Sequence, residues 1–250
     1  KGSSNPAARL ASLRTRLSEA GFAGFLVPHA DEHQNEFLPG RAERLAWLTG
    51  FTGSAGLAIV LADAAAVFVD GRYTLQVRDQ VEEGLYETLH LTETPPADWI
   101  AEHLPAGGRL AYDPWLHTPS DVARMRAACG RAEAELEACE ANPLDAVWHD
   151  QPPPPIAPVV PHDIRFTGTG SDEKRKDIAA ALEKRKADAA VLSTPASIAW
   201  LLNIRGGDVP RTPLPLGFAI LGRGGRVRLF MDGRKAAPEL VALMDTKDYM

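Results

Sequence analysis

The fold prediction rests on residues 46–72, AWLTGFTGSAGLAIVLADAAAVFVDGR, because residues 199–234 repeat their order of features. Each segment opens with Ala-Trp-Leu and closes with Asp-Gly-Arg, and two apolar runs joined by a turn lie between. Two short apolar runs around a turn predict a β-hairpin. Similarity at a long spacing within one chain indicates duplicated folding units. We therefore expect two domains of one fold in tandem.

The two copies align at both ends of this pattern but differ in length. Four apolar positions before the hairpin match at a constant offset of 165, pairing Leu13, Leu17, Leu26 and Val27 with Ile178, Leu182, Val191 and Leu192. Trp47 precedes Asp70 by 23 residues, whereas Trp200 precedes Asp232 by 32. The second copy is therefore expected to carry an insertion, RGGDVPRTPLP at residues 205–215.

Helices and strands alternate along the first copy. The apolar spacing and turn signals predict a helix over 10–20, strands at 24–27, 57–62 and 65–70, a helix over 73–84, a strand at 85–91, a helix over 98–104, a strand at 109–114, and a helix over 121–136 capped by Ser120. Interleaved elements of this kind predict the α/β class, with a mixed β-sheet flanked by helices.

A proline-rich segment separates the two copies. Six of the eleven residues in QPPPPIAPVVP, residues 151–161, are proline. This density favours extended polyproline II and excludes a helix interior. We interpret it as a semi-rigid spacer between domains; a docking motif for a proline-binding partner is the alternative. Ser171 is the candidate N-cap of the helix that follows.

The predicted domain borders follow from this spacer. We expect a processed or added end at 1–7, a first domain at 8–150, the linker at 151–170 and a second domain at 171–250. From Arg72 the first copy continues for 78 residues to Asp150, whereas 16 residues follow Arg234. The second copy is therefore expected to be incomplete.

Charge and composition exclude several functional classes. The 250 residues hold 27 Lys and Arg against 33 Asp and Glu, a net charge of −6, so the basic footprint of a nucleic-acid binder is missing. No apolar run reaches the roughly 18 residues of a membrane span, and no signal segment opens the sequence. We therefore expect neither nucleic acid nor membrane as a partner.

The cysteines point to a reducing compartment. Cys129 and Cys139 fall on a predicted helical stretch, where ten residues span about 15 Å. A disulfide needs Cα atoms within roughly 7 Å of each other. Two free thiols and a cytoplasmic location are therefore predicted, with a reactive thiol pair as the alternative.

The motifs GFTGSAG (50–56), VDGRY (69–73) and NIRGGDV (203–209), in this order, resemble the N-terminal region of long-form cytosolic aminopeptidase P, in the creatinase and prolidase superfamily. The resemblance covers residues 8–250. It implies tandem creatinase N-terminal-like domains with a ribonuclease H-like motif, followed by a metallopeptidase domain. It also implies two Mn(II) ions in that further domain, a homodimer, and a peptide substrate with proline second.

Arg72 is the predicted substrate-binding residue. It follows a predicted strand, and Gly71 permits a tight turn there. A guanidinium offers a planar fork that matches a carboxylate or a peptide carbonyl, and the resemblance implies that this arginine contacts the peptide. An ion pair with a neighbouring acid is the alternative. Arg234 lacks the following tyrosine, so the role is not extended to it.

Five further residues are candidates for lining the substrate cleft: Asp31, His33, Glu36, Trp47 and Tyr73. His29, Asp31 and His33 could bind zinc if their loop folded back. The family pattern, matched at Asp31, His33, Gln34 and Glu36, omits His29, so a polar loop is preferred. No catalytic or metal-binding residue is predicted in this chain, and Trp47 and Trp200 are also expected to anchor the core.

The leading functional prediction is the non-catalytic N-terminal region of an Xaa-Pro aminopeptidase, which shapes the substrate cleft and the dimer. The alternative is a peptidase-like module that binds peptides or proteins without catalysis. A dinucleotide-binding dehydrogenase is excluded because no G-x-G-x-x-G follows the first strand. A P-loop is excluded because GFTGSAG lacks the Gly-Lys-Ser/Thr ending.

Overall fold

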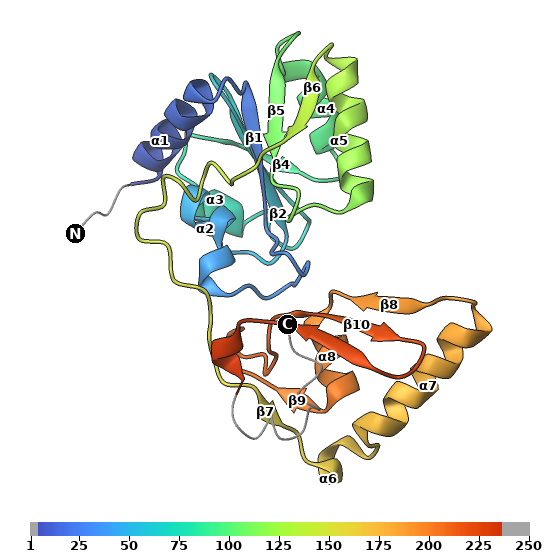
Figure 1. Cartoon of the computed structure of the whole chain (residues 1–250). Helices are drawn as coiled ribbons and strands as arrows, with labels where there is room; N and C mark the ends of the chain where they lie inside the picture. The colour runs from blue at the N-terminus through green and yellow to red at the C-terminus, as the bar shows by residue number, and fades with distance from the viewer. Residues whose placement is uncertain (1–4, 237–250) are drawn as a thin grey trace. The chain divides into compact units, whose positions relative to one another are not determined.

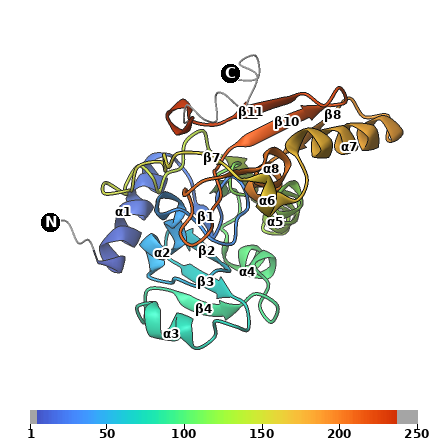
Figure 2. The same cartoon turned by 90° about the horizontal axis from the view of Figure 1, so that it is seen from below.

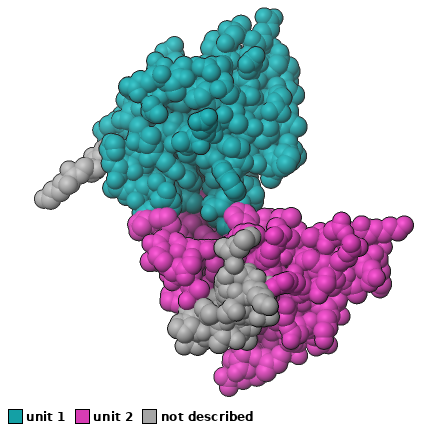
Figure 3. Space-filling view, viewed as in Figure 1, with its two compact units in different colours: residues 1–36, 40–152 teal, residues 37–39, 153–250 magenta. Residues whose placement is uncertain are grey.

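The computed structural model describes residues 5–236, which belong to two compact units. Unit 1 comprises residues 1–36 and 40–152, and unit 2 comprises residues 37–39 and 153–250 (Figure 3). The chain passes from one unit to the other between Pro152 and Pro153, inside the predicted linker. The borders at 150 and 171 remain a prediction.

Unit 1 is built on a six-stranded mixed sheet in the order β4-β3-β2-β1-β5-β6 (Figures 1 and 2). Its elements are α1 (Pro6–Glu19), β1 (Gly24–Pro28), η1 (Gly40–Ala42), α2 (Arg44–Thr49), β2 (Gly56–Leu61), β3 (Ala65–Val69), α3 (Gln76–Gln80), β4 (Glu87–His90), α4 (Pro96–His103), β5 (Arg109–Tyr112), α5 (Pro119–Arg131) and β6 (Glu135–Ala138). β2 runs antiparallel to β1 and β3, and the other neighbours are parallel. The α/β class with a mixed sheet is confirmed.

Helices cover both faces of this sheet. On one face α1 and α2 pack their leucines against alternate strand residues such as Phe25 and Val60. On the other face α4 and α5 cover Leu26 and Phe68. Successive strand residues point to opposite faces, so the strands are buried on both sides and contain almost only apolar residues.

The start of α5 corrects two expectations. Thr118, and not Ser120, is the N-cap: its side chain accepts from the main-chain N–H of Asp121, whose carboxylate accepts from the N–H of Thr118. The helix ends at Arg131, and residues 135–138 form β6 beside β5 instead of continuing it. Pairing with a strand edge overrides the helix propensity of this alanine- and glutamate-rich stretch.

Cys139 therefore lies beyond β6 and not on a helix, although both cysteines are free and buried as expected. Burial raises the pKa of each thiol to about 11, which keeps both protonated at neutral pH. The helix expected over 73–84 is also shorter than predicted, since α3 covers only Gln76–Gln80.

Unit 2 has a three-stranded sheet in the order β11-β10-β8 and a two-stranded sheet of β7 and β9. Its elements are β7 (Val160–Pro161), α6 (Ile164–Thr167), α7 (Ser171–Lys184), β8 (Ala189–Leu192), α8 (Pro195–Leu202), β9 (Ile204–Arg205), β10 (Phe218–Gly222), β11 (Val227–Phe230) and η2 (Gly233–Lys235). β7 and α6 fall within the predicted linker. Ser171 is the first residue of α7, whose N-cap is Gly170, so the predicted cap is wrong.

The strand registers of the two units correspond residue by residue. Leu26 pairs with Ile59 across β1 and β2, and Val191 pairs with Ile220 across β8 and β10. Ala58 pairs with Val67 in the first hairpin, just as Ala219 pairs with Leu229 in the second. The helix before each hairpin ends on a left-handed residue, at φ 86° for Gly50 and 52° for Asn203.

The insertion predicted in the second copy lies between β9 and β10. One expectation about the repeat is wrong: Trp200 is 52% exposed and does not anchor the core. Within residues 5–236, no helix has the length and apolarity that crossing a membrane requires.

Candidate substrate-contact site

The candidate site lies at one edge of the unit 1 sheet. β1, β3, β4 and β5 all run in the same direction, so their carboxyl ends meet at this edge, and the antiparallel β2 begins there. The loop after β1 is tied to the start of β2 by a hydrogen bond of 2.9 Å from the N–H of His29 to the carbonyl of Gly56. Loops at strand carboxyl ends are where α/β proteins usually bind ligands.

The Asp-Gly-Arg turn after β3 fixes the guanidinium of Arg72. Asp70 accepts the main-chain N–H of Arg72 at 2.9 Å and its Nη2 at 2.7 Å, and Nε lies 3.1 Å from Oδ2. Nη1 lies 3.9 Å from a carboxylate oxygen of Glu36 and makes no hydrogen bond within the described chain. The arginine is thus oriented by one acid, with its Nη1 open to an external acceptor.

Glu36, Ser54 and Tyr73 form a hydrogen-bonded cluster beside this arginine. The hydroxyl of Ser54 donates to Glu36 at 3.1 Å and lies 2.8 Å from the hydroxyl of Tyr73. The guanidinium carbon of Arg72 stands 5.1 Å from the centre of the Tyr73 ring, within cation–π range. Phe51 packs against the Tyr73 ring in a T-shaped arrangement, with 5.6 Å between the ring centres.

The charges of this cluster are set by the same contacts. Hydrogen bonds from Arg72 hold the pKa of Asp70 below its usual value, and Asp70 raises the pKa of Arg72. Arg72 is more than half exposed, with 59% of its side chain accessible. The site therefore presents a permanent, oriented cation to solvent.

The loop between β1 and Glu36 is organised from inside by Asp31. This fully buried carboxylate accepts the N–H groups of His33 and Asn35, each at 3.0 Å, and the side-chain amide of Asn35 at 2.8 Å. His33 is also buried, with 5% exposed. Both residues support the loop that carries Glu36, and their lining of a cleft remains a prediction.

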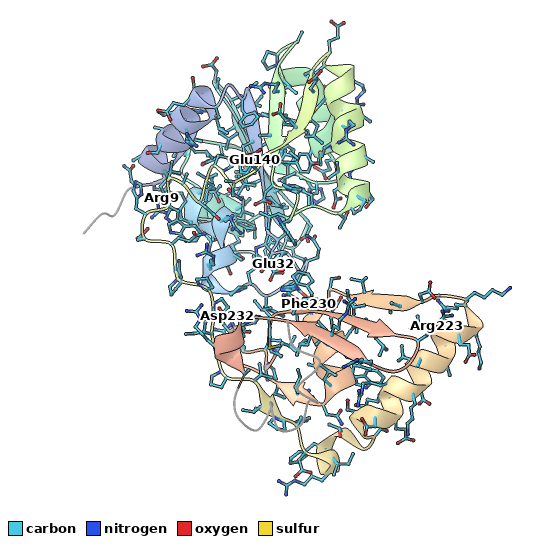
Figure 4. The ribbon with its side chains drawn as sticks, viewed as in Figure 1. Arg9, Glu32, Glu140, Arg223, Phe230 and Asp232 are labelled. Atoms are coloured by element: carbon cyan, nitrogen blue, oxygen red, sulfur yellow. The ribbon has the colours of Figure 1, made fainter. Side chains whose placement is uncertain are left out.

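Trp47 lies apart from the cluster. It is half-buried and stacks on Trp148 at 5.2 Å, while Arg9, labelled on α1 in Figure 4, lies over its ring at 5.0 Å. The expectation that this tryptophan anchors the core agrees with these contacts. Its role as a wall of the substrate cleft stays a prediction.

The donor groups of the loop do not suit a metal ion. The oxygens of Asp31 already accept three N–H groups, and Nε2 of His29 is engaged with the carbonyl of Glu36 at 3.0 Å. Across residues 5–236, no group of three or more His, Cys, Asp or Glu side chains could hold a metal.

Ser54 and Asp70 are the site residues that sequence reasoning missed. Both lie inside motifs that were singled out, GFTGSAG and VDGRY, so a signal was present. What the motifs could not show is that residues 18 or more positions apart share hydrogen bonds.

Comparison with known proteins agrees with this architecture. The creatinase/prolidase N-terminal domain family matches residues 9–146, and a second family of the same description matches residues 150–249. The chain belongs to the creatinase/prolidase N-terminal domain family. It also matches the N-terminal region of Xaa-Pro aminopeptidases, and this match confirms the resemblance indicated by the motifs.

Two curated relatives and one solved structure illustrate the match. Human Xaa-Pro aminopeptidase 2 is 30% identical over 245 residues, 97% of this chain and 36% of that protein. Aminopeptidase P1 of Lotus japonicus is 33% identical over 92% of this chain and 35% of its own length. The X-prolyl aminopeptidase of Caenorhabditis elegans, described as a cytosolic enzyme with a di-nuclear active site, superposes with a TM-score of 0.90 at 26% identity, over 98% of this chain and 42% of its own. The chain thus spans little more than a third of these curated relatives.

Proposed function

We propose that this chain is the non-catalytic N-terminal region of an Xaa-Pro aminopeptidase, where it shapes the substrate cleft and supplies Arg72 to a peptide with proline second. The observation that carries the proposal is the similarity to the X-prolyl aminopeptidase of C. elegans along 98% of this chain. The proposal includes a homodimer, a cytoplasmic location and two Mn(II) ions in the catalytic region of the whole protein.

The geometry of Arg72 supports a contact with a peptide carbonyl or carboxylate. Asp70 occupies Nε and Nη2, so Nη1 remains to donate to the substrate. A charge-assisted hydrogen bond is stronger than a neutral one. Because the guanidinium is already oriented, less side-chain freedom is lost when the peptide binds.

The test on this chain uses peptide binding and a matched control. A labelled Ala-Pro-Ala-Ala peptide is titrated into the wild type, Arg72→Ala and Arg234→Ala. Arg234 sits in the same turn of unit 2, with an equally exposed side chain and its own Asp partner. We expect Arg72→Ala to weaken binding and Arg234→Ala to leave it unchanged. Equal effects of the two variants would contradict the role of Arg72.

In the complete enzyme, Arg72→Ala should lower kcat/KM by about 10- to 150-fold, the size of one charge-assisted hydrogen bond. Arg72→Lys should recover part of the loss, since an ammonium lacks the two-pronged geometry. The 250-residue chain alone should release no N-terminal residue from an Xaa-Pro peptide, with or without Mn(II). Metal-dependent release by the purified chain would overturn the non-catalytic assignment.

A peptide-binding module without catalysis is the second candidate, and the exposure of the Arg72 cluster within this chain favours it. The sequence that follows residue 250 in the natural protein separates the two candidates. The five carboxylate and histidine ligands of a dinuclear site would indicate the enzyme, and their replacement would indicate the binding module.

A further inference from the structure

A cavity opens at the carboxyl edge of the unit 1 sheet, and none of the residues of the Arg72 cluster lines it. Its volume is about 410 Å³, within the usual range of small-ligand sites. It lies between the loop after β1, represented by His29, and the loop after β5, represented by His117. β1 and β5 are parallel neighbours whose chains depart toward opposite faces of the sheet. Where the chain leaves two neighbouring parallel strands toward opposite faces of an open α/β sheet, a crevice forms that commonly binds ligands.

The walls of this cavity are mainly apolar. Leu57 from β2, Leu91 after β4, Leu116 before α5 and Met125 from α5 all line it. Leu57, Leu116 and Met125 are at most 8% exposed, so these walls are held in place by the packed core. A ligand that enters with an apolar group removes that group from water against a preformed surface, which favours binding.

The two oppositely charged side chains that line the cavity pair with each other. Arg124 and Asp121, both in the first two turns of α5, are paired at 2.5 Å. Burial lowers the pKa of His117, so its imidazole is neutral at pH 7. Burying a charged ligand without an unpaired counter-ion is costly. The site therefore selects against charged groups while offering hydrogen-bond donors and acceptors.

Two observations point to an amide as the polar partner. His117 lines the cavity, and its Nε2 is buried without a hydrogen-bond partner in the described part of the chain. Gln34, exposed at the rim, is held at φ 57° and donates to the carbonyl of Asp31 at 3.3 Å. Its amide oxygen can accept from a peptide N–H, while Arg124 can donate to a peptide carbonyl.

We infer that this cavity binds a short peptide segment through one uncharged apolar side chain, with the flanking peptide groups at Arg124 and Gln34. The volume accommodates one leucine- or phenylalanine-sized side chain with its adjoining peptide units. None of the described side chains that line the cavity requires proline in that segment. The inference goes beyond the proposed contact at Arg72 and does not depend on it.

The test uses three neutral or charged probes on the 250-residue chain with labelled methionine and leucine methyl groups. N-acetyl-leucinamide should shift the methyl resonances of Met125, Leu57 and Leu116 saturably. N-acetylglycinamide, which lacks the side chain, should bind at least about tenfold more weakly, because burial of a leucine side chain supplies that factor. The α-amide of N-acetyl-aspartate, whose side-chain carboxylate is charged, should also bind more weakly than N-acetyl-leucinamide.

A pair of variants on α4 provides the control. Ala97 lines the cavity, whereas Ala101 lies on the same helix away from it, and both are half-buried. Ala97→Phe should fill the mouth and abolish the shifts caused by N-acetyl-leucinamide. Ala101→Phe should leave them unchanged. Arg124→Gln keeps a hydrogen-bond donor but loses the charge-assisted contact, so it should weaken the binding of N-acetyl-leucinamide by about fivefold.

The outcomes are decisive in either direction. The inference is supported if the leucine probe binds and Ala97→Phe, but not Ala101→Phe, removes that binding while thermal unfolding shows both variants folded. It is overturned if the methyl groups do not respond to N-acetyl-leucinamide, if the glycine or aspartate probe binds as tightly, or if folded Ala97→Phe binds the probe like the wild type. Arg72→Ala should leave these shifts unchanged, so failure here is distinguishable from failure of the proposed substrate contact.

Discussion

The two Asp-Gly-Arg turns of the molecule share one geometry but differ in their surroundings. Arg72 and Arg234 each donate a main-chain N–H to the preceding aspartate at 2.9 Å, and their Nη2 atoms donate at 2.7 and 2.5 Å. Asp232, labelled in Figure 4, occupies the place in unit 2 that Asp70 occupies in unit 1. The motif alone therefore builds an oriented arginine and does not make a site.

The residue after each arginine accounts for the difference. Tyr73 turns to the open cluster and meets Ser54 at 2.8 Å. Lys235 turns inward, where its ammonium pairs with Asp208 at 2.7 Å and donates to the carbonyl of Leu216 at 3.0 Å. Asp208 comes from the insertion that only the second copy has. One backbone turn thus serves a solvent-facing cluster in unit 1 and a buried ion pair in unit 2.

A second shared contact joins α1 in unit 1 and α7 in unit 2 to a tryptophan of the same unit. Nη1 of Arg9 donates to the carbonyl of Trp47, and Nζ of Lys174 donates to that of Trp200 at 2.9 Å. Each cation also lies over the ring of the same tryptophan, at 5.0 and 4.7 Å. A cation at these carbonyls satisfies acceptors left open where a helix ends.

The largest expected difference between the units concerns the sheet face that α4 and α5 cover in unit 1. Leu26 is 1% exposed and its counterpart Val191 is 75% exposed. Leu26→Lys should prevent unit 1 from folding, because an unpaired buried ammonium costs several kcal/mol. Val191→Lys should change the free energy of unfolding by less than about 0.5 kcal/mol. Urea denaturation followed by circular dichroism measures both changes, and similar losses of stability in the two variants would contradict this difference between the units.

A second expected difference lies between the buried Lys235–Asp208 ion pair of unit 2 and the solvent-facing Arg72 cluster of unit 1. Lys235→Met leaves the fully buried Asp208 unpaired and should destabilise unit 2 by about 3–5 kcal/mol. Tyr73→Phe removes one hydrogen bond at the surface and should cost about 1 kcal/mol or less. Amide hydrogen exchange assigns each loss to its unit.

A control keeps the buried-pair comparison specific. In the Lys235→Met background, Asp208→Asn should recover part of the stability, since the remaining charge is removed and the amide oxygen still accepts from one of the two N–H groups, those of Ala157 and Leu216, that bind the two oxygens of Asp208. No recovery would mean that packing of the lysine stem, and not the ion pair, holds this part of unit 2.

Substitutions at the N-termini of α5 and α7 should change the free energy of unfolding less than the substitutions above. Thr118→Ala removes the capping box of α5 and should cost about 1 kcal/mol of unfolding free energy. Ser171→Ala should change it by less than about 0.5 kcal/mol, because Gly170 is the N-cap of α7. Thermal denaturation of the two variants checks this order, and an equal loss in Ser171→Ala would restore it as a cap.

The smallest expected effect is the loss of folding stability at acidic pH that comes from the two Asp-Gly-Arg turns. Hydrogen bonds from the arginines hold the pKa values of Asp70 and Asp232 below the usual 3.8. Stability from a lowered pKa is present above the unfolded-state value and is lost as pH falls through the folded-state value. Both pairs face solvent, so the loss below pH 3.8 should be slight. Carboxyl-carbon NMR should show Asp70 returning toward its usual pKa in Arg72→Ala while Asp232 stays low; a shift of both would contradict independent turns.

Much of the fold was predictable because it depends on neighbours in sequence. The hairpins of residues 57–70 and 218–230 follow from apolar runs around short turns, and the offset of 165 predicted which strand residues would correspond. Arg72, Tyr73 and Glu36 are candidates from motifs and their resemblance to a family, and the structure places them in one cluster, while their roles stay a prediction. The error at residues 132–138 arose because a free strand edge, a non-local feature, outweighs local helix propensity.

The sequence by itself thus determined the duplicated hairpins, the turn that orients each arginine and the family of the chain, since each depends on a short contiguous pattern. Only the tertiary structure decided that Ser54 joins Glu36 to Tyr73, that Asp31 points inward, and that Lys235 is buried where Tyr73 is not. Those outcomes depend on which distant loops meet at a strand end. Hydrogen bonds and burial across such distances leave no mark in a local pattern of residue types.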